Sequence, residues 1–264
     1  MRMQSIKPGA LATAPAGAAS LSAAEWQARV ELAACYRLLA HLGISDLTYN
    51  HLSVRVPGDA DCLLIKSQTM MFEEITASNL LKFNFDGDPL QDSPRLRGGG
   101  LVIHAGILKA RPDLNAVFHT HSPANIGVSA QKQGLLMISQ HAVYFYGRLA
   151  YHDFGGFEFN MDQRDPLIHS LGRERVAILR NHGALVCGRT LPEAFIDHHF
   201  LEMACRGQIA ALSGGAEVNI MDEALCRTAA AQQQDRMDDP ARAAAKDWDA
   251  CLRLADRLFP EYKT

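Results

Sequence analysis

The spacing of hydrophobic positions alternates along the chain between the period of a helix and that of a strand. Apolar residues recur at helical spacing after Ser22, and this pattern ends at Gly43, so we expect a long first helix. Apolar or alternating segments follow at 51–56, 62–66 and 80–85, separated by turns that contain glycine. These segments predict strands, of which the first two form a hairpin.

The same two patterns continue through the rest of the chain. We expect helices over 101–110, 123–131, 165–171 and from Thr190 to Leu212, and strands over 117–121, 176–180 and 184–187. The segment from residue 220 onward is helical in pattern and is broken at Pro240. Because strands and helices mix without a strict alternation, the sequence predicts an α/β fold whose sheet is largely antiparallel or mixed, with helices on its faces.

Composition limits the classes of protein that fit this pattern. The 264 residues are 48% hydrophobic, and the formal net charge of −3 argues against a nucleic-acid partner. No apolar run approaches the ~20 residues of a membrane span. Six scattered cysteines without a C-x-x-C pair favour a reduced, cytoplasmic protein. Residues 1–20, rich in Ala, Pro and Gly, predict a flexible tail.

The segment V-F-H-T-H at 117–121 carries the clearest chemical signal. A strand sends alternate side chains to the same face, so His119 and His121 point together. A third imidazole from His182, in N-H-G, would complete a metal site with an open coordination position. Ordinary polar residues on a strand are the alternative interpretation.

Other segments occur with these histidines in a fixed order. They are F-E-E-I-T-A-S at 72–78, R-P-D at 111–113, A-V-F-H-T-H-S at 116–122, R-N-H-G-A-L at 180–185 and G-R-T at 188–190. Over about residues 22–212 the combination resembles the family of class II aldolases and adducin head domains.

This resemblance implies a three-layer α/β/α sandwich over residues 21–215. A C-terminal helical extension over 216–264 would pack on this domain or on a neighbouring subunit. The resemblance also implies a homo-oligomer, usually a tetramer, with active sites at subunit interfaces. In family enzymes the matched histidines hold one divalent cation, which assigns His119, His121 and His182 as ligands. Zinc is the first choice, and manganese, iron and cobalt stay open.

The chain departs from the family pattern before its helix histidine, His104. Family aldolases carry a catalytic Glu four residues earlier, preceded by two Ser that help to bind phosphate. Here those positions are Gly100, Gly98 and Gly99. We therefore expect phosphorylated sugars to be poor substrates, and the glycines to leave room for a bulkier substrate.

Other positions supply candidates for substrate binding and proton transfer. Asn50 and Ser67 match parts of the family's phosphate cradle, and Arg97 would hold a carboxylate unless it is a solvated loop arginine. The family's proton-donating Tyr, from a partner subunit, falls near Gln140 and His141. His141 is the candidate acid–base group, because an imidazole titrates near neutral pH.

The residues that match the family without the catalytic Glu predict the chemistry of a metal-dependent carbon–carbon lyase. A cation held by neutral imidazoles stabilises negative charge during decarboxylation or retro-aldol cleavage of a small hydroxy- or oxo-acid or carbonyl compound. Two alternatives stay open: a three-histidine non-heme iron oxygenase, and an adducin-like binding module without catalysis. We interpret His104, His198 and Tyr144 as packing or hydrogen-bonded structural residues.

Overall fold

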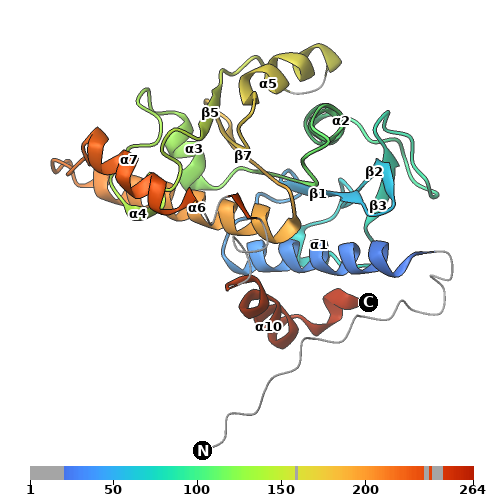
Figure 1. The fold of residues 1–264 in the computed structure, drawn as a ribbon. Coiled ribbons are helices and arrows are strands. Elements are labelled where there is room, and N and C mark those ends of the chain that lie inside the picture. The colour runs from blue at the N-terminus through green and yellow to red at the C-terminus, as the bar shows by residue number, and fades with distance from the viewer. Residues whose placement is uncertain (1–20, 158–159, 235–237, 240–245) are drawn as a thin grey trace, which may run out of the picture.

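The chain folds as a mixed sheet covered by helices on both faces (Figure 1). The computed structural model describes residues 21–157, 160–234, 238–239 and 246–264. The predicted tail over 1–20 and the predicted break at Pro240 lie outside these residues. Within them, no helix is long and apolar enough to cross a membrane.

The sheet has seven strands in the order β3-β2-β1-β4-β7-β6-β5 in the described part of the chain. The strands are β1 (His51–Val56), β2 (Asp59–Ile65), β3 (Leu81–Asn84), β4 (Ala116–Thr120), β5 (Leu149–His152), β6 (Val176–Leu179) and β7 (Gly183–Gly188). Only β5 and β6 pair in parallel, and the other pairs are antiparallel. This confirms the predicted mixed, largely antiparallel sheet.

Helices cover the two faces of this sheet as separate layers. They are α1 (Ala23–His41), α2 (Gly106–Ala110), α3 (Pro123–Ser129), α4 (Gln140–Val143), α5 (Arg164–Leu171), α6 (Leu191–Ser213), α7 (Glu223–Gln232) and α10 (Trp248–Leu258). The short 3₁₀-helices are η1 (Phe72–Glu74), η3 (Met161–Gln163) and η4 (Pro260–Lys263). The segment η2 (Gly100–Ala105) is a π-helix. α1 and α6 lie on one face, and α2 and α5 lie on the other (Figure 1).

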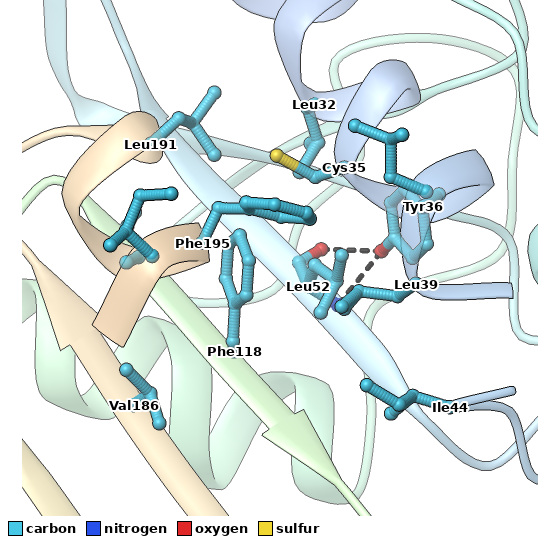
Figure 2. Packing of buried hydrophobic residues seen from close by; sticks show 14 of the residues in the cluster. Leu32, Cys35, Tyr36, Leu39, Ile44, Leu52, Phe118, Val186, Leu191 and Phe195 are labelled. Atoms are coloured by element: carbon cyan, nitrogen blue, oxygen red, sulfur yellow. Dashed lines mark hydrogen bonds between the residues drawn. The ribbon is translucent and has the colours of Figure 1, made fainter. Parts of the chain in front are cut away.

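Strand alternation divides the core between these two faces. Leu52, Phe118 and Val186 pack toward α1 and α6, in the cluster that Figure 2 shows. Val117 and Leu185, one position along their strands, pack in the second cluster with α2 and α5. His119 of β4 and His121, which directly follows β4, point together as predicted, with their Nε2 atoms 2.8 Å apart.

The first helix is fixed at its start by a cap and in its middle by a tyrosine. Ser22 Oγ accepts a hydrogen bond from the Glu25 N–H at 3.1 Å, so Ser22 is the N-cap of the helix that was predicted to follow it. The buried hydroxyl of Tyr36 donates to the Leu52 carbonyl and accepts from the Leu52 N–H at 2.9 Å (Figure 2). These bonds tie α1 to β1, the strand next to the candidate site.

Several local features differ from the sequence-based predictions. The strand β5 was not predicted, because four residues are too few to show a period. The predicted helix over 101–110 is present, but its first part, η2, has the wider π-helical hydrogen bonding before α2 continues it. β4 ends at Thr120, one residue before the predicted end.

The C-terminal segment packs on the domain within the same chain. Trp248 of α10 contacts the ring of Phe195 of α6, with 5.5 Å between ring centroids. The N–H of Ala77 donates to the Tyr262 carbonyl at 2.9 Å. The division into a domain over 21–215 and an extension over 216–264 stays a prediction.

Candidate metal centre

Three imidazoles converge at one end of the central strands. The Nε2 atoms of His119 and His121 are 2.8 Å apart, and each lies 3.1–3.2 Å from Nε2 of His182. The ligand atoms of a tetrahedral zinc site with 2.0–2.1 Å bonds are about 3.3 Å apart. The three nitrogens therefore lie close to the spacing at which they can share one ion, as the sequence predicted.

His119 is held in one orientation by the neighbouring strand. Its Nδ1 donates to the Ala184 carbonyl of β7 at 3.0 Å, since a carbonyl oxygen can only accept. Burial and the nearby imidazoles hold the pKa of His119 well below its ordinary value, so the ring is neutral. A neutral ring with its proton on Nδ1 directs a lone pair from Nε2 toward the other two histidines.

His121 is oriented from the loop before β1. Its Nδ1 lies 3.0 Å from Oδ2 of Asp46, and its backbone N–H donates to Oδ1 of Asn50 at 2.9 Å. A carboxylate that accepts the Nδ1 proton fixes the tautomer and raises the basicity of Nε2. Asp46 therefore aligns His121 for a ligand on its other nitrogen.

His182 is supplied by the turn between β6 and β7. Asn181, just before it, adopts the left-handed conformation with φ at 57°, which asparagine tolerates better than most residues. Gly183 follows, and a β-carbon there would lie 2.5 Å from the Thr120 carbonyl oxygen. The N-H-G sequence is thus required for the turn to bring His182 against the end of β4.

The protonation pattern tests whether these residues fit a cation. His119 donates from Nδ1, and a neutral His121 that donates from Nδ1 to Asp46 turns its Nε2 lone pair toward that of His119 across 2.8 Å. Such an arrangement is repulsive unless a positive charge lies between the rings. The three nitrogens therefore fit a divalent cation, and three neutral imidazole ligands leave positions open for another molecule.

The three predicted substrate-binding residues lie in two regions. Asn50 is buried beside His121, and its Nδ2 has no hydrogen-bond partner among the described residues. Ser67 is half-buried and contacts Thr69. The side chain of Arg97 is exposed, but its carbonyl accepts from Gln68 Nε2 at 3.1 Å, which joins the loops of Ser67 and Arg97.

The structure does not bring His141 to the three histidines within one chain. Its ring lies against Phe200 of α6, with 5.5 Å between ring centroids. Its predicted acid–base role therefore depends on delivery by a neighbouring subunit and stays a prediction.

The space beside the three glycines is partly filled. A β-carbon at Gly100 would lie 2.6 Å from Cδ1 of Leu96, and one at Gly99 would lie 3.1 Å from Nε2 of His51. Leu96 covers Gly100 in this structure, and the expectation that these glycines leave room for a larger substrate stays a prediction.

One part of the site was missed by the sequence analysis. His51 on β1 is paired with His119 on β4, and their ring centroids are 5.1 Å apart. His51 Nδ1 lies 2.6 Å from His104 Nε2, and His104 Nδ1 lies 2.6 Å from Ser53 Oγ. The alternation His51-Leu52-Ser53 was the available signal, because it places two polar side chains on one face.

The remaining candidates have structural partners. His104 is hydrogen-bonded at both ring nitrogens, which confirms the interpretation of a satisfied helix histidine. His198 is buried, and its Nε2 lies 2.7 Å from the Thr120 hydroxyl. The Tyr144 hydroxyl donates to Asp197 at 2.8 Å.

Comparison with known proteins agrees with the fold and identifies the family. The family model described as the class II aldolase and adducin N-terminal domain matches residues 30–209. The chain therefore belongs to the class II aldolase and adducin N-terminal domain family.

Individual relatives place it more closely. It is 39% identical over 246 residues to a Caulobacter vibrioides protein that carries the provisional name of an aldolase class 2 protein, covering 92% of this chain and 94% of that one. A crystal structure of an aldolase II superfamily protein from Pseudomonas syringae superposes with a TM-score of 0.89 at 40% identity, covering 95% of this chain and 100% of that one. Rat alpha-adducin is 38% identical over 198 residues, which are 73% of this chain but only 27% of the adducin.

Proposed function

We propose that this protein is a metal-dependent lyase that cleaves a carbon–carbon bond in a small hydroxy- or oxo-acid or carbonyl compound. The observation that carries the proposal is the convergence of three Nε2 atoms within 2.8–3.2 Å, with Nδ1 of His119 and Nδ1 of His121 each placed against an oxygen acceptor. His119, His121 and His182 would hold one divalent cation, and zinc is the first choice because imidazole suits it.

The chain's own residues prepare this centre. The Ala184 carbonyl and Asp46 hold the two β4-end imidazoles in the ligand tautomer before any ion arrives. A cation bound there supplies Lewis acidity, which stabilises negative charge on an oxygen next to the breaking bond. Because position 100 is glycine, we favour decarboxylation, in which CO2 leaves and no carboxylate base is needed.

The substrate is proposed to lie between this centre and the loops around it. The Asn50 Nδ2 group is a buried donor without a partner in the described part of the chain, and an unmade bond of this kind costs about 1–3 kcal/mol. A substrate oxygen would satisfy it. Ser67 and Arg97 lie on adjoining loops and are proposed to bind the far end of the substrate.

Phosphorylated sugars are proposed to be poor substrates. Gly98 and Gly99 lack the hydroxyl groups that family aldolases direct at phosphate, and each charge-assisted bond lost costs about 1.5–3 kcal/mol. Retro-aldol cleavage of a non-phosphorylated substrate remains within the proposal.

Assembly and proton transfer form one part of the proposal. The active form would be a homotetramer with the sites near subunit boundaries, and His141 of a neighbouring subunit would protonate the product carbanion. Six free cysteines, five of them buried, are consistent with the proposed cytoplasmic location.

The test combines metal analysis with a substrate screen. Freshly purified protein should contain one divalent cation per chain, and His121→Ala should lose it, whereas the exposed His169→Ala should not. Metal-replete protein is then screened against hydroxy- and oxo-acids for release of CO2 or aldehyde. Equal metal content in His121→Ala and His169→Ala would refute the proposed centre.

The screen also separates the alternatives. Oxygen consumption that depends on substrate and iron, without release of CO2 or aldehyde, would identify an oxygenase. No product and no oxygen uptake across the screen would favour a binding module of the adducin kind.

A further inference from the structure

Hydrogen bonds link His51 to His104 and His104 to Ser53, and only one donor-to-acceptor direction is possible along this hydrogen-bond chain. Ser53 is fully buried, and its hydroxyl contacts Nδ1 of His104 at 2.6 Å, with no second partner among the described residues. A buried hydroxyl proton needs an acceptor, so the hydroxyl must donate to Nδ1 of His104. His104 then carries its own proton on Nε2.

The same logic fixes the next ring. Nε2–H of His104 donates to Nδ1 of His51 across 2.6 Å. The neutral His51 ring must then carry its proton on Nε2. His51 therefore presents an N–H donor at the end of the chain.

The donor faces an opening rather than a protein acceptor. No described residue hydrogen-bonds to Nε2 of His51. The ring is half-buried, and its Nε2 atom remains accessible to solvent. Its outer edge faces Gly99, where a β-carbon would lie 3.1 Å from Nε2. Glycine at this position leaves the N–H open to a small molecule beside His119, the cross-strand neighbour of His51.

We propose that His51 is a substrate-contacting residue, a neutral hydrogen-bond donor to a carboxylate or carbonyl oxygen, and that Ser53 and His104 are positioning residues that fix its tautomer. This inference rests on the proposed function and extends it to substrates with a second oxygen next to the one at the histidine centre. A neutral imidazole that polarises a carbonyl is effective because its proton is held in place and not lost.

The donor-to-acceptor direction of the hydrogen bonds from Ser53 through His104 to His51 is tested on metal-free protein. Long-range ¹H–¹⁵N NMR correlations report which ring nitrogen carries the proton, and His51→Phe identifies the His51 signals. We expect the proton on Nε2 of both His51 and His104, and a mixture of tautomers in Ser53→Ala. Ser170→Ala, which removes a hydroxyl 2.9 Å from a different imidazole, His152, should leave the His51 signals unchanged. A proton on Nδ1 of His51 in the wild-type protein would overturn the proposal.

The contact between His51 and a substrate oxygen is tested with oxalate, which offers oxygen atoms both to the cation at the three histidines and to Nε2–H of His51. Calorimetry on zinc-loaded protein should show oxalate binding about 10- to 100-fold weaker in His51→Phe, the range for one hydrogen bond to a charged acceptor. The exposed His169→Phe should bind as the wild type does. Unchanged affinity in His51→Phe would refute the contact.

These results separate the two proposals. If the wild-type protein binds no zinc, the proposed function fails, and the tautomer of His51 in the metal-free protein still decides the direction of the chain. If zinc binds with three histidines and His51→Phe has no effect on oxalate, only this inference fails.

Discussion

The carboxylate of Asp46 is expected to set the affinity of the three-histidine centre. Its Oδ2 lies 3.0 Å from Nδ1 of His121, and its side chain is 41% exposed. Loss of a carboxylate that supports a ligating histidine lowers metal affinity by 10–100-fold in typical sites. Partial exposure screens the charge, which moves the effect of the charge alone toward the lower end of that range.

Two substitutions separate charge from hydrogen bonding. Asp46→Asn keeps an oxygen that accepts from Nδ1, so it removes only the charge and should weaken zinc binding about tenfold, or ~1.4 kcal/mol. Asp46→Ala removes both and should approach 100-fold. His121→Ala, which deletes the ligand, should abolish measurable binding.

The assay is competition with a chromophoric chelator at fixed pH and ionic strength. Asp153→Asn is the matched control, because that carboxylate is 94% exposed and its ion-pair partner is Arg180 and not a site histidine. Zinc affinity of Asp46→Ala within twofold of both the wild type and the control would show that Asp46 does not support the centre.

Three further predictions test other parts of the molecule. Burial lowers the pKa of His198 from 6.5 to about 3, so the unfolded chain takes up its proton first as the pH falls, and stability is lost between pH 6.5 and 3. The wild type should therefore lose about 2 kcal/mol more unfolding free energy than His198→Gln between pH 7 and pH 5 in urea titrations, and equal losses would contradict this. Gly183→Ala should cost roughly 1–3 kcal/mol of stability by calorimetry, because its β-carbon meets the Thr120 carbonyl, whereas Gly207→Ala, with nothing within 4 Å, should not destabilise. His141→Gln should keep the metal and lower the turnover rate by ~10²–10⁴-fold, and full activity would remove His141 from the mechanism.

The sequence was sufficient to predict the parts of the site that depend on local pattern. The alternation over 117–121 placed His119 with His121, and the predicted helix starts at Ser22 and Thr190 are the N-caps of α1 and α6 in the structure. Each of these signals is contained within a few neighbouring residues, so it does not require knowledge of the tertiary fold.

Partners from distant segments could not be predicted in this way. Asp46 is 75 positions from His121, and nothing in the loop sequence shows which residue it will meet. His51 lies beside His119 only because β1 pairs with β4 in one register, and a shift of one residue would turn its ring to the other face. The π-helical form of η2 depends on a hydrogen-bonding register that apolar spacing does not specify.

The pairing of β4 with β7 has a consequence for biosynthesis. His119 and His121 are synthesised before His182, which follows them by 63 and 61 residues. The Ala184 carbonyl that orients His119 is synthesised later still. A nascent chain that ends before β7 offers at most two imidazoles, which form a weak and unselective ligand pair. If the three histidines hold a cation as proposed, its selection would wait until most of the sheet has been synthesised and paired, and the cellular metal pool would act on the nearly folded chain rather than on its early intermediates.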